Sequence, residues 1–275
     1  MLDYFDYAEP TCLLCGGKEF YNPELSDAVG RIPIRRIIEK LDELFNVNDM
    51  DGAGKLLEYW LNEAVSLNDK EGELAVLSEL LGYYRKVGNK EKGLESVEKS
   101  KKLIDELYAE KGVAAATILL NAATTMKCFG LSKEAISVYD EAYAVYEKTL
   151  KKDDLSFAGF YNNKALCLVD LKKYDKAEEC YKNALQILNK KSKVLPDIAV
   201  TKVNMAHLYY EWNGDKKQIT DCLFDAYGVL TDEKVQKNGY YAYVCSKCAP
   251  SFEFFGYDVI AKELQEMAKN IYARN

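Results

Sequence analysis

Two cysteine pairs have the spacing that structural zinc sites use. Two residues separate Cys12 from Cys15, and two separate Cys245 from Cys248. A closed zinc site takes four ligands, so the two pairs together would supply a complete set of thiolates. Alternatively, Cys245 and Cys248 are packing residues, because free cysteine behaves as a small hydrophobe. The sequence leaves both interpretations open, and no other cofactor is expected.

Catalytic groups are scarce in this chain. His207 is the one histidine, which makes His-based triads and multi-histidine metal sites hard to build. The stretch 52–55 (Gly-Ala-Gly-Lys) is similar to a phosphate loop, but the Walker pattern requires a glycine where Asp49 stands and a hydroxyl where Leu56 stands. The sequence therefore predicts a protein that is not an enzyme.

Three asparagines recur at one position of an internal repeat. Asn121, Asn163 and Asn204 each stand two residues before an alanine, and Glu79 holds the equivalent place one unit earlier. Asparagine is a poor helix former because its amide competes for backbone hydrogen bonds, so its recurrence requires a reason. One reason is that an amide both donates and accepts, and can bind the backbone of a peptide. The alternative is that each amide bonds a neighbouring helix and sets the stacking register.

The elements that position these residues follow a period of 42 residues. Small residues recur at Gly93, Ala135, Ala177 and Ala261, with Ile219 in the remaining place, and neighbouring members are 42 residues apart. Self-similarity at this length is typical of stacked supersecondary units, none of which can bury its apolar face alone.

One period contains two amphipathic helices. In residues 154–189, apolar side chains at helical spacing form two stripes with a break at Lys172-Lys173. Neighbouring units have Gly130 or Gly214 at this break, and glycine supplies the left-handed conformation that ends a helix. The sequence therefore predicts an all-α fold.

This helix pair resembles the tetratricopeptide repeat, which has a small residue late in its first helix and Ala, aromatic, Ala in its second. Ala165, Ala177, Tyr181 and Ala184 match that pattern. The usual unit has 34 residues, so each helix here should be longer by about one turn, as in the long-repeat branch that includes kinesin light chains. The resemblance implies a right-handed α-solenoid of about six antiparallel helix pairs.

We expect a non-repetitive arm followed by the solenoid. Residues 1–31 have no helical period but contain five aromatic side chains, which favours an arm packed on the repeats. The solenoid, residues 32–275, divides into the approximate units 32–68, 69–110, 111–152, 153–193, 194–235 and 236–275. The last unit is rich in aromatic residues, which indicates either a terminal cap or a docking surface. Its Pro250 should bend or interrupt the first helix of that unit.

The resemblance also implies that the first helix of each pair lines a concave groove. Besides the three asparagines and Glu79, the inward candidates are Arg85, Thr124, Lys127, Asn162, Asp170 and Tyr210. The carboxylate clamp of chaperone-binding members needs lysine and arginine at set positions, which Asn162 and Leu166 do not reproduce. An acidic C-terminal peptide is therefore not the expected ligand.

Composition narrows the class of partner and the compartment. The net charge is −7, which disfavours nucleic-acid binding. The first residues are acidic rather than basic, unlike a secretory signal, and the least polar stretch, 113–126, is too short to span a bilayer. Eight cysteines without a disulfide pattern fit a reducing cytoplasm. We expect a cytoplasmic protein that contacts neither nucleic acid nor membrane.

The preferred function is a protein- or peptide-binding scaffold that holds an extended segment in the groove. The alternative is a zinc- or thiol-dependent sensor whose N-terminal arm covers that groove. Peptide-sensing bacterial regulators share this architecture, so a bacterial-type regulator that acts through a partner is one expected role. Self-association through the aromatic last repeat is another.

Overall fold

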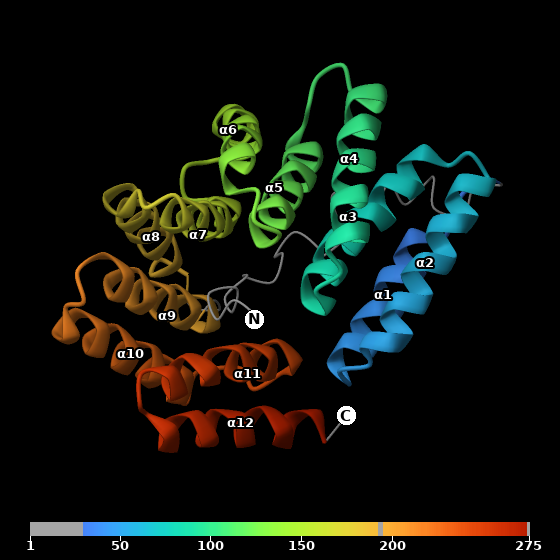
Figure 1. The fold of residues 1–275 in the computed structure, drawn as a ribbon. Coiled ribbons are helices and arrows are strands. Elements are labelled where there is room, and N and C mark those ends of the chain that lie inside the picture. The colour runs from blue at the N-terminus through green and yellow to red at the C-terminus, as the bar shows by residue number, and fades with distance from the viewer. Residues whose placement is uncertain (1–29, 192–194, 274–275) are drawn as a thin grey trace. The chain divides into compact units, whose positions relative to one another are not determined.

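Helices make up nearly all of the structure, a computed structural model that describes residues 30–191 and 195–273. Over these ranges the chain forms twelve α-helices and no strand (Figure 1). The helices are α1 (Ile34–Asn46), α2 (Met50–Ser66), α3 (Lys70–Val87), α4 (Lys90–Leu107), α5 (Val113–Cys128), α6 (Ser132–Thr149), α7 (Leu155–Asp170), α8 (Tyr174–Leu188), α9 (Leu195–Trp212), α10 (Lys216–Thr231), α11 (Gly239–Phe254) and α12 (Asp258–Tyr272). The predicted all-helical fold is confirmed.

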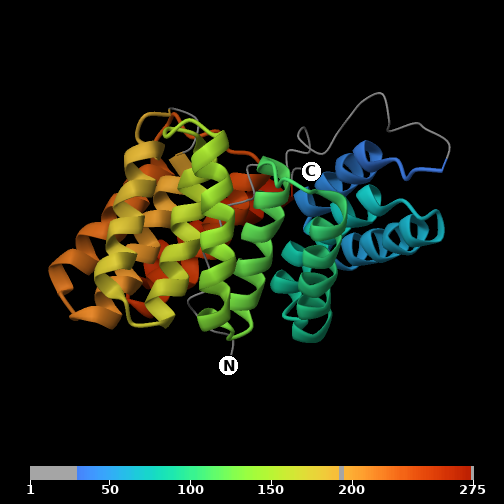
Figure 2. The same ribbon diagram turned by 90° about the horizontal axis from the view of Figure 1, so that it is seen from above.

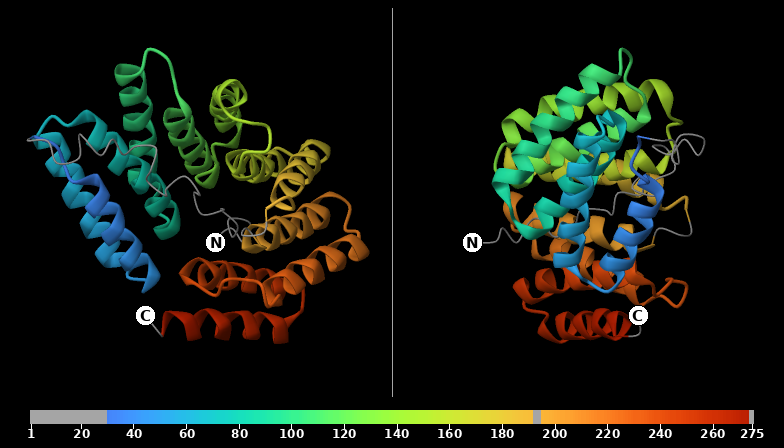
Figure 3. Two further views of the ribbon diagram at one scale, coloured as in Figure 1. Left: turned by 180° about the vertical axis from the view of Figure 1, so that it is seen from behind. Right: turned by 90° about the vertical axis from the view of Figure 1, so that its right-hand side faces the viewer.

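The helices belong to two compact units. The described part of one unit, residues 30–152, holds α1 to α6, and that of the other, residues 153–191 and 195–273, holds α7 to α12. Within each unit consecutive helices pack as pairs, and each pair stacks on the next. In the second unit α7 to α10 lie side by side (Figure 2), and α11 and α12 form the last antiparallel pair (Figure 3). The predicted organisation in helix pairs is confirmed.

Small and aromatic residues alternate in the second helix of a pair. The triads are Ala135, Tyr139 and Ala142 in α6, and Ala177, Tyr181 and Ala184 in α8, all with 0% exposure. Alanine allows the helices to approach closely, and the tyrosine rings fill the space beside them. In α4 the small position is Gly93, where a Cβ atom would lie 2.5 Å from Cε2 of Phe129.

The turn between the two helices of a pair contains a left-handed residue. The glycines 88, 130, 214 and 256 have φ angles of 69°, 86°, 64° and 85°. Lys172 adopts φ 56° at the same place without the freedom of glycine, which costs about 1 kcal/mol. The turn conformation predicted for the glycines is thus present even where the sequence departs from glycine.

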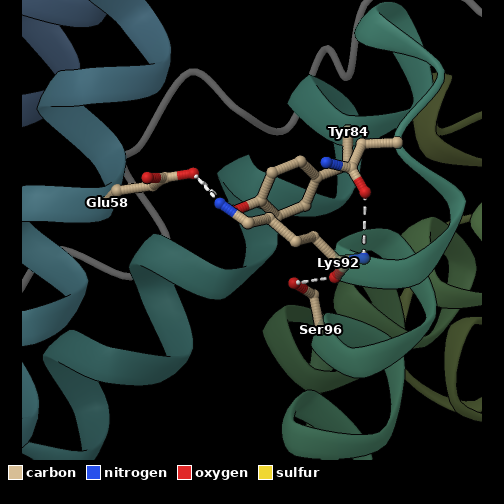
Figure 4. A network of polar contacts seen from close by, with 5 residues as sticks. Glu58, Tyr84, Lys92 and Ser96 are labelled. Atoms are coloured by element: carbon tan, nitrogen blue, oxygen red, sulfur yellow. Dashed lines mark hydrogen bonds and ion pairs between the residues drawn. The ribbon is translucent and has the colours of Figure 1, made fainter.

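A single carboxylate joins α2 to both helices of the next pair (Figure 4). Glu58 of α2 accepts hydrogen bonds from the Lys92 ammonium at 2.6 Å and from the Tyr84 hydroxyl at 3.2 Å. The Ser96 hydroxyl donates to the Lys92 carbonyl at 2.8 Å and so continues the network along α4. These contacts orient the first, less regular pair on the second.

Helix α11 continues through Pro250, so the expected interruption does not occur. The residues that follow the proline hold the helix against its neighbours: Ser251 and Phe252 are 0% and 1% exposed. The hydroxyl of Ser251 also lies 2.9 Å from Nε2 of His207 in α9. This packing stabilises a helical backbone at a position where proline removes one hydrogen bond.

In the part of the chain that the structure describes, every helix is too short or too polar to cross a lipid bilayer.

Candidate binding site

Three of the predicted asparagines, Asn162, Asn163 and Asn204, each hold a buried amide atom without a partner among the described residues. Asn163 of α7 and Asn204 of α9 occupy the same position in neighbouring repeats, with exposed fractions of 7% and 3%. Among the described residues, Oδ1 of Asn163 and Nδ2 of Asn204 make no hydrogen bond. Such an unsatisfied buried group costs about 1–3 kcal/mol. Each of these two side chains therefore has one polar atom with an unused hydrogen bond, an acceptor in Asn163 and a donor in Asn204.

Asn121, in the other unit, makes a contact that stacks two repeats. Its Nδ2 donates to the hydroxyl of Ser78 in α3 at 3.5 Å. From the same helix, Nη1 of Arg85 donates to the Asn121 carbonyl at 3.2 Å and to the Thr125 hydroxyl at 2.9 Å. At this repeat the geometry favours the role in stacking register over the role in binding.

Asn162 and Thr124 are also bonded within the packed interior. Nδ2 of Asn162 donates to the Thr201 hydroxyl in α9 at 2.9 Å. The Thr124 hydroxyl donates to the Leu120 carbonyl at 2.8 Å and lies 3.0 Å from the Tyr139 hydroxyl, which must then be the donor between them. These bonds join Asn162 to the next pair and Thr124 to its own second helix.

The remaining predicted residues differ widely in exposure. Glu79 of α3 is half-buried and Lys127 of α5 is buried, whereas Asp170 at the end of α7 is exposed. Tyr210 of α9 has an exposed fraction of 48%. The two exposed residues thus lie in the unit that also holds Asn163 and Asn204.

Tyr210 belongs to an aromatic cluster that the sequence reasoning did not assemble. Its ring centroid lies 5.2 Å from that of Phe254 and 5.8 Å from that of Phe255 in the segment that ends α11. The His207 ring lies 5.0 Å from Phe255, and burial lowers the pKa of His207 to about 4, so this histidine is neutral at physiological pH. The aromatic residues were visible in the sequence, but their contact requires α9 to stack on α11.

The candidate zinc ligands are only partly described. Cys245 and Cys248 are 0% and 1% exposed, and burial raises the pKa of Cys245 to about 11. Over the described ranges no three side chains of histidine, cysteine, aspartate or glutamate gather as a metal site. Cys12 and Cys15 lie outside those ranges, so the four-thiolate site stays a prediction.

Comparison with known proteins identifies the class of fold. Residues 158–189, which cover most of α7 and α8, match the family model of the tetratricopeptide repeat. This match includes Ala165, Ala177, Tyr181 and Ala184, on which the predicted resemblance was based. The structure therefore has the fold of tetratricopeptide repeat proteins, and the predicted resemblance is confirmed.

The similar solved structures include a putative kinesin light chain. A putative kinesin light chain from Podosopora anserina, described as having nearly identical TPR-like repeats, is 18% identical, with a TM-score of 0.51 over 73% of this chain and 95% of that chain. A point variant of it gives 18% identity over the same shares and a TM-score of 0.52. At this identity the likeness shows the fold alone. The search of curated proteins finds no match to this chain.

Tetratricopeptide repeats typically form scaffolds for protein–protein interaction and are generally not enzymes. The fold thus agrees with the coarse functional class expected from the sequence.

Proposed function

We propose that this chain binds a partner protein by holding an extended segment of it against the first helices α7 and α9. The observation that supports the proposal is the pair of buried amide atoms, Oδ1 of Asn163 and Nδ2 of Asn204, that have no partner among the described residues. An extended peptide backbone carries an N–H donor and a C=O acceptor on every residue except proline, so it supplies both missing partners without depending on its side chains.

The spacing of the two asparagines suits such a ligand. They occupy equivalent positions on α7 and α9, which pack against each other, and packed helices have axes about 8–10 Å apart. An extended chain rises about 3.3 Å per residue, so backbone groups two to three residues apart span that distance. Such a segment would cross the helices rather than follow them.

Selection from a random dodecapeptide library displayed on phage tests the proposal, with the full chain as bait. Fluorescence anisotropy then compares the best peptide on the wild type and on the double variant Asn163→Ala, Asn204→Ala. We expect at least about tenfold weaker binding by the double variant, because two hydrogen bonds to the ligand are lost. Its stability should be equal to or above that of the wild type, because no intramolecular hydrogen bond is removed.

Asn121→Ala is the matched control, since Asn121 bonds Ser78 inside the protein. It should lower the free energy of unfolding by about 1 kcal/mol and leave the affinity of the same peptide unchanged. Equal affinity of the double variant and the wild type would contradict the proposal.

A further inference from the structure

The C-terminal ends of α9 and α11 form an exposed aromatic patch, which consists of Tyr210, Phe254 and Phe255. Tyr210 is 48% and Phe254 is 42% exposed. The rings meet edge to face, with 5.0 Å between the centroids of Phe254 and Phe255 and an interplanar angle of 83°. Since an exposed aromatic cluster costs free energy in water, such a patch indicates a contact surface.

Two acidic residues are next to this patch in the sequence. Glu211 follows Tyr210, Glu253 precedes Phe254, and both carboxylates are exposed. Neither α9 nor α11 has a basic residue in its last turn, so the negative ends of both helix dipoles add to the charge.

The basic residue nearest along the same face of α11 does not neutralise this charge. Lys247 stands seven residues before Phe254, about 10 Å along the helix axis, and its ammonium lies 5.7 Å from the Tyr243 ring. That separation is about a Debye length at physiological salt, so the Lys247 charge is largely screened from the carboxylates.

The same repeat position is basic in the other unit. In the register of the repeats, which is close to 42 residues, Tyr210 and Glu253 correspond to Arg85 and Lys127 of α3 and α5. Their basic side chains stand in the last turn of those helices, where they suit the dipole. In α9 and α11 this compensation has been replaced by aromatic rings and carboxylates, a combination that attracts a cation.

We propose that the aromatic patch binds an arginine or lysine side chain of the partner segment; this inference rests on the proposed function and names the chemistry of that partner. Aromatic faces attract cations, and the exposed carboxylates of Glu211 and Glu253, the sequence neighbours of Tyr210 and Phe254, supply ion-pair partners. Arginine fits better than lysine, because its planar guanidinium can stack on Tyr210 or Phe254 while it donates to a carboxylate.

The peptides selected from the dodecapeptide library provide the first test. We expect enrichment of arginine and lysine at one position. In anisotropy measurements the double variant Glu211→Gln, Glu253→Gln should bind the best peptide about tenfold more weakly than the wild type. The variant Tyr210→Ala, Phe254→Ala should do the same without any change in charge.

Asp221→Asn, Glu266→Gln is the matched control. It removes the same charge from exposed positions on the second helices α10 and α12, so its affinity should equal that of the wild type. Thermal unfolding of all variants verifies that they are folded. Raising the salt concentration from about 0.05 to about 0.5 M should weaken binding by the wild type more than by the glutamine variant.

Four results would overturn the inference. The patch does not recognise a cation if the selected peptides lack basic residues, or if the glutamine variant binds with wild-type affinity. The proposed function stands in either case if the Asn163→Ala, Asn204→Ala variant still loses binding. A wild type that sediments as a dimer, with Tyr210→Ala as a monomer, would assign the patch to a second copy of the chain. A library that yields no specific binder contradicts the proposed function and this inference together.

Discussion

Replacing Tyr181 with phenylalanine should stabilise this protein, although it deletes a polar group from the interior. Tyr181 is 0% exposed, and its hydroxyl has no hydrogen-bond partner among the described residues. The Tyr139 hydroxyl, 42 residues earlier, bonds Thr124 at 3.0 Å. Leu166 stands 42 residues after Thr124, and leucine has no acceptor to offer. Tyr181 therefore lacks the hydrogen-bond partner that the equivalent Tyr139 has.

The two tyrosines predict effects of opposite sign. Burial of a hydroxyl without a partner costs about 1–3 kcal/mol, and part of the gain on its removal is offset by the small void left behind. Tyr181→Phe should therefore raise the free energy of unfolding by about 1 kcal/mol. Tyr139→Phe removes a hydrogen bond and leaves Thr124 without its donor, so it should lower the free energy by about 1 kcal/mol.

Urea unfolding followed by far-UV circular dichroism measures both changes, provided that the slope with denaturant is the same for all variants. A decrease in stability for Tyr181→Phe, like that of Tyr139→Phe, would refute the reasoning, because it would mean that the Tyr181 hydroxyl has a partner. Leu166→Thr provides a further control, because it restores the missing acceptor. Leu166→Thr should lower the free energy of unfolding less in the wild type than in the Tyr181→Phe variant, and the difference, the coupling energy of the pair, should be about 1 kcal/mol.

Two further predictions concern buried groups elsewhere in the fold. Asp197 is 2% exposed, and burial raises its pKa to about 6 despite a 2.7 Å hydrogen bond from Tyr240. Because this pKa exceeds the unfolded value of about 3.9, the stability contributed by the protonated carboxyl is complete below about pH 4 and is lost as the pH rises through 6. Asp197→Asn should raise the free energy of unfolding at pH 8 by on the order of 2 kcal/mol and leave it unchanged at pH 4. Urea unfolding at both pH values measures this difference. Equal gains in stability at pH 4 and pH 8 would contradict the prediction. Gly93→Ala should destabilise the protein by about 1–3 kcal/mol, because the new Cβ atom would lie 2.5 Å from the Phe129 ring. Gly228→Ala should stabilise it by up to about 1 kcal/mol, because no other atom lies within 4 Å of the new Cβ atom. Calorimetry should show that the two substitutions move the melting temperature in opposite directions.

The asparagine ladder shows where prediction from the sequence stopped. The shared repeat position of Asn121, Asn163 and Asn204 was visible as a pattern, and so were its two explanations. Choosing between them required the residue opposite each amide. Ser78 meets Asn121, while no partner among the described residues meets Oδ1 of Asn163 or Nδ2 of Asn204. Residues of one ladder therefore differ in their hydrogen bonding.

The sequence also indicated only part of the exposed aromatic patch. Phe254 and Phe255 marked the last unit as unusually aromatic, with a cap or a docking surface as alternatives. Their contact with Tyr210 depends on the stacking of α11 on α9, which sets residues more than 40 positions apart beside each other. Pro250 was expected to bend or interrupt α11, but the helix continues through it, and the neighbouring Ser251 lies within hydrogen-bond distance of His207 in α9.

The amino-acid sequence by itself determined the helices, their pairing and the turns between them. These features depend on groups a few residues apart: apolar side chains at helical spacing, alanines where backbones approach, and a left-handed residue after each first helix. Only the tertiary structure decided which buried polar side chains are satisfied and which are left without a hydrogen-bond partner. Those decisions depend on pairs such as Asn121 with Ser78, 43 residues apart, because a buried amide group is satisfied or unsatisfied by the residue that stacking places opposite it.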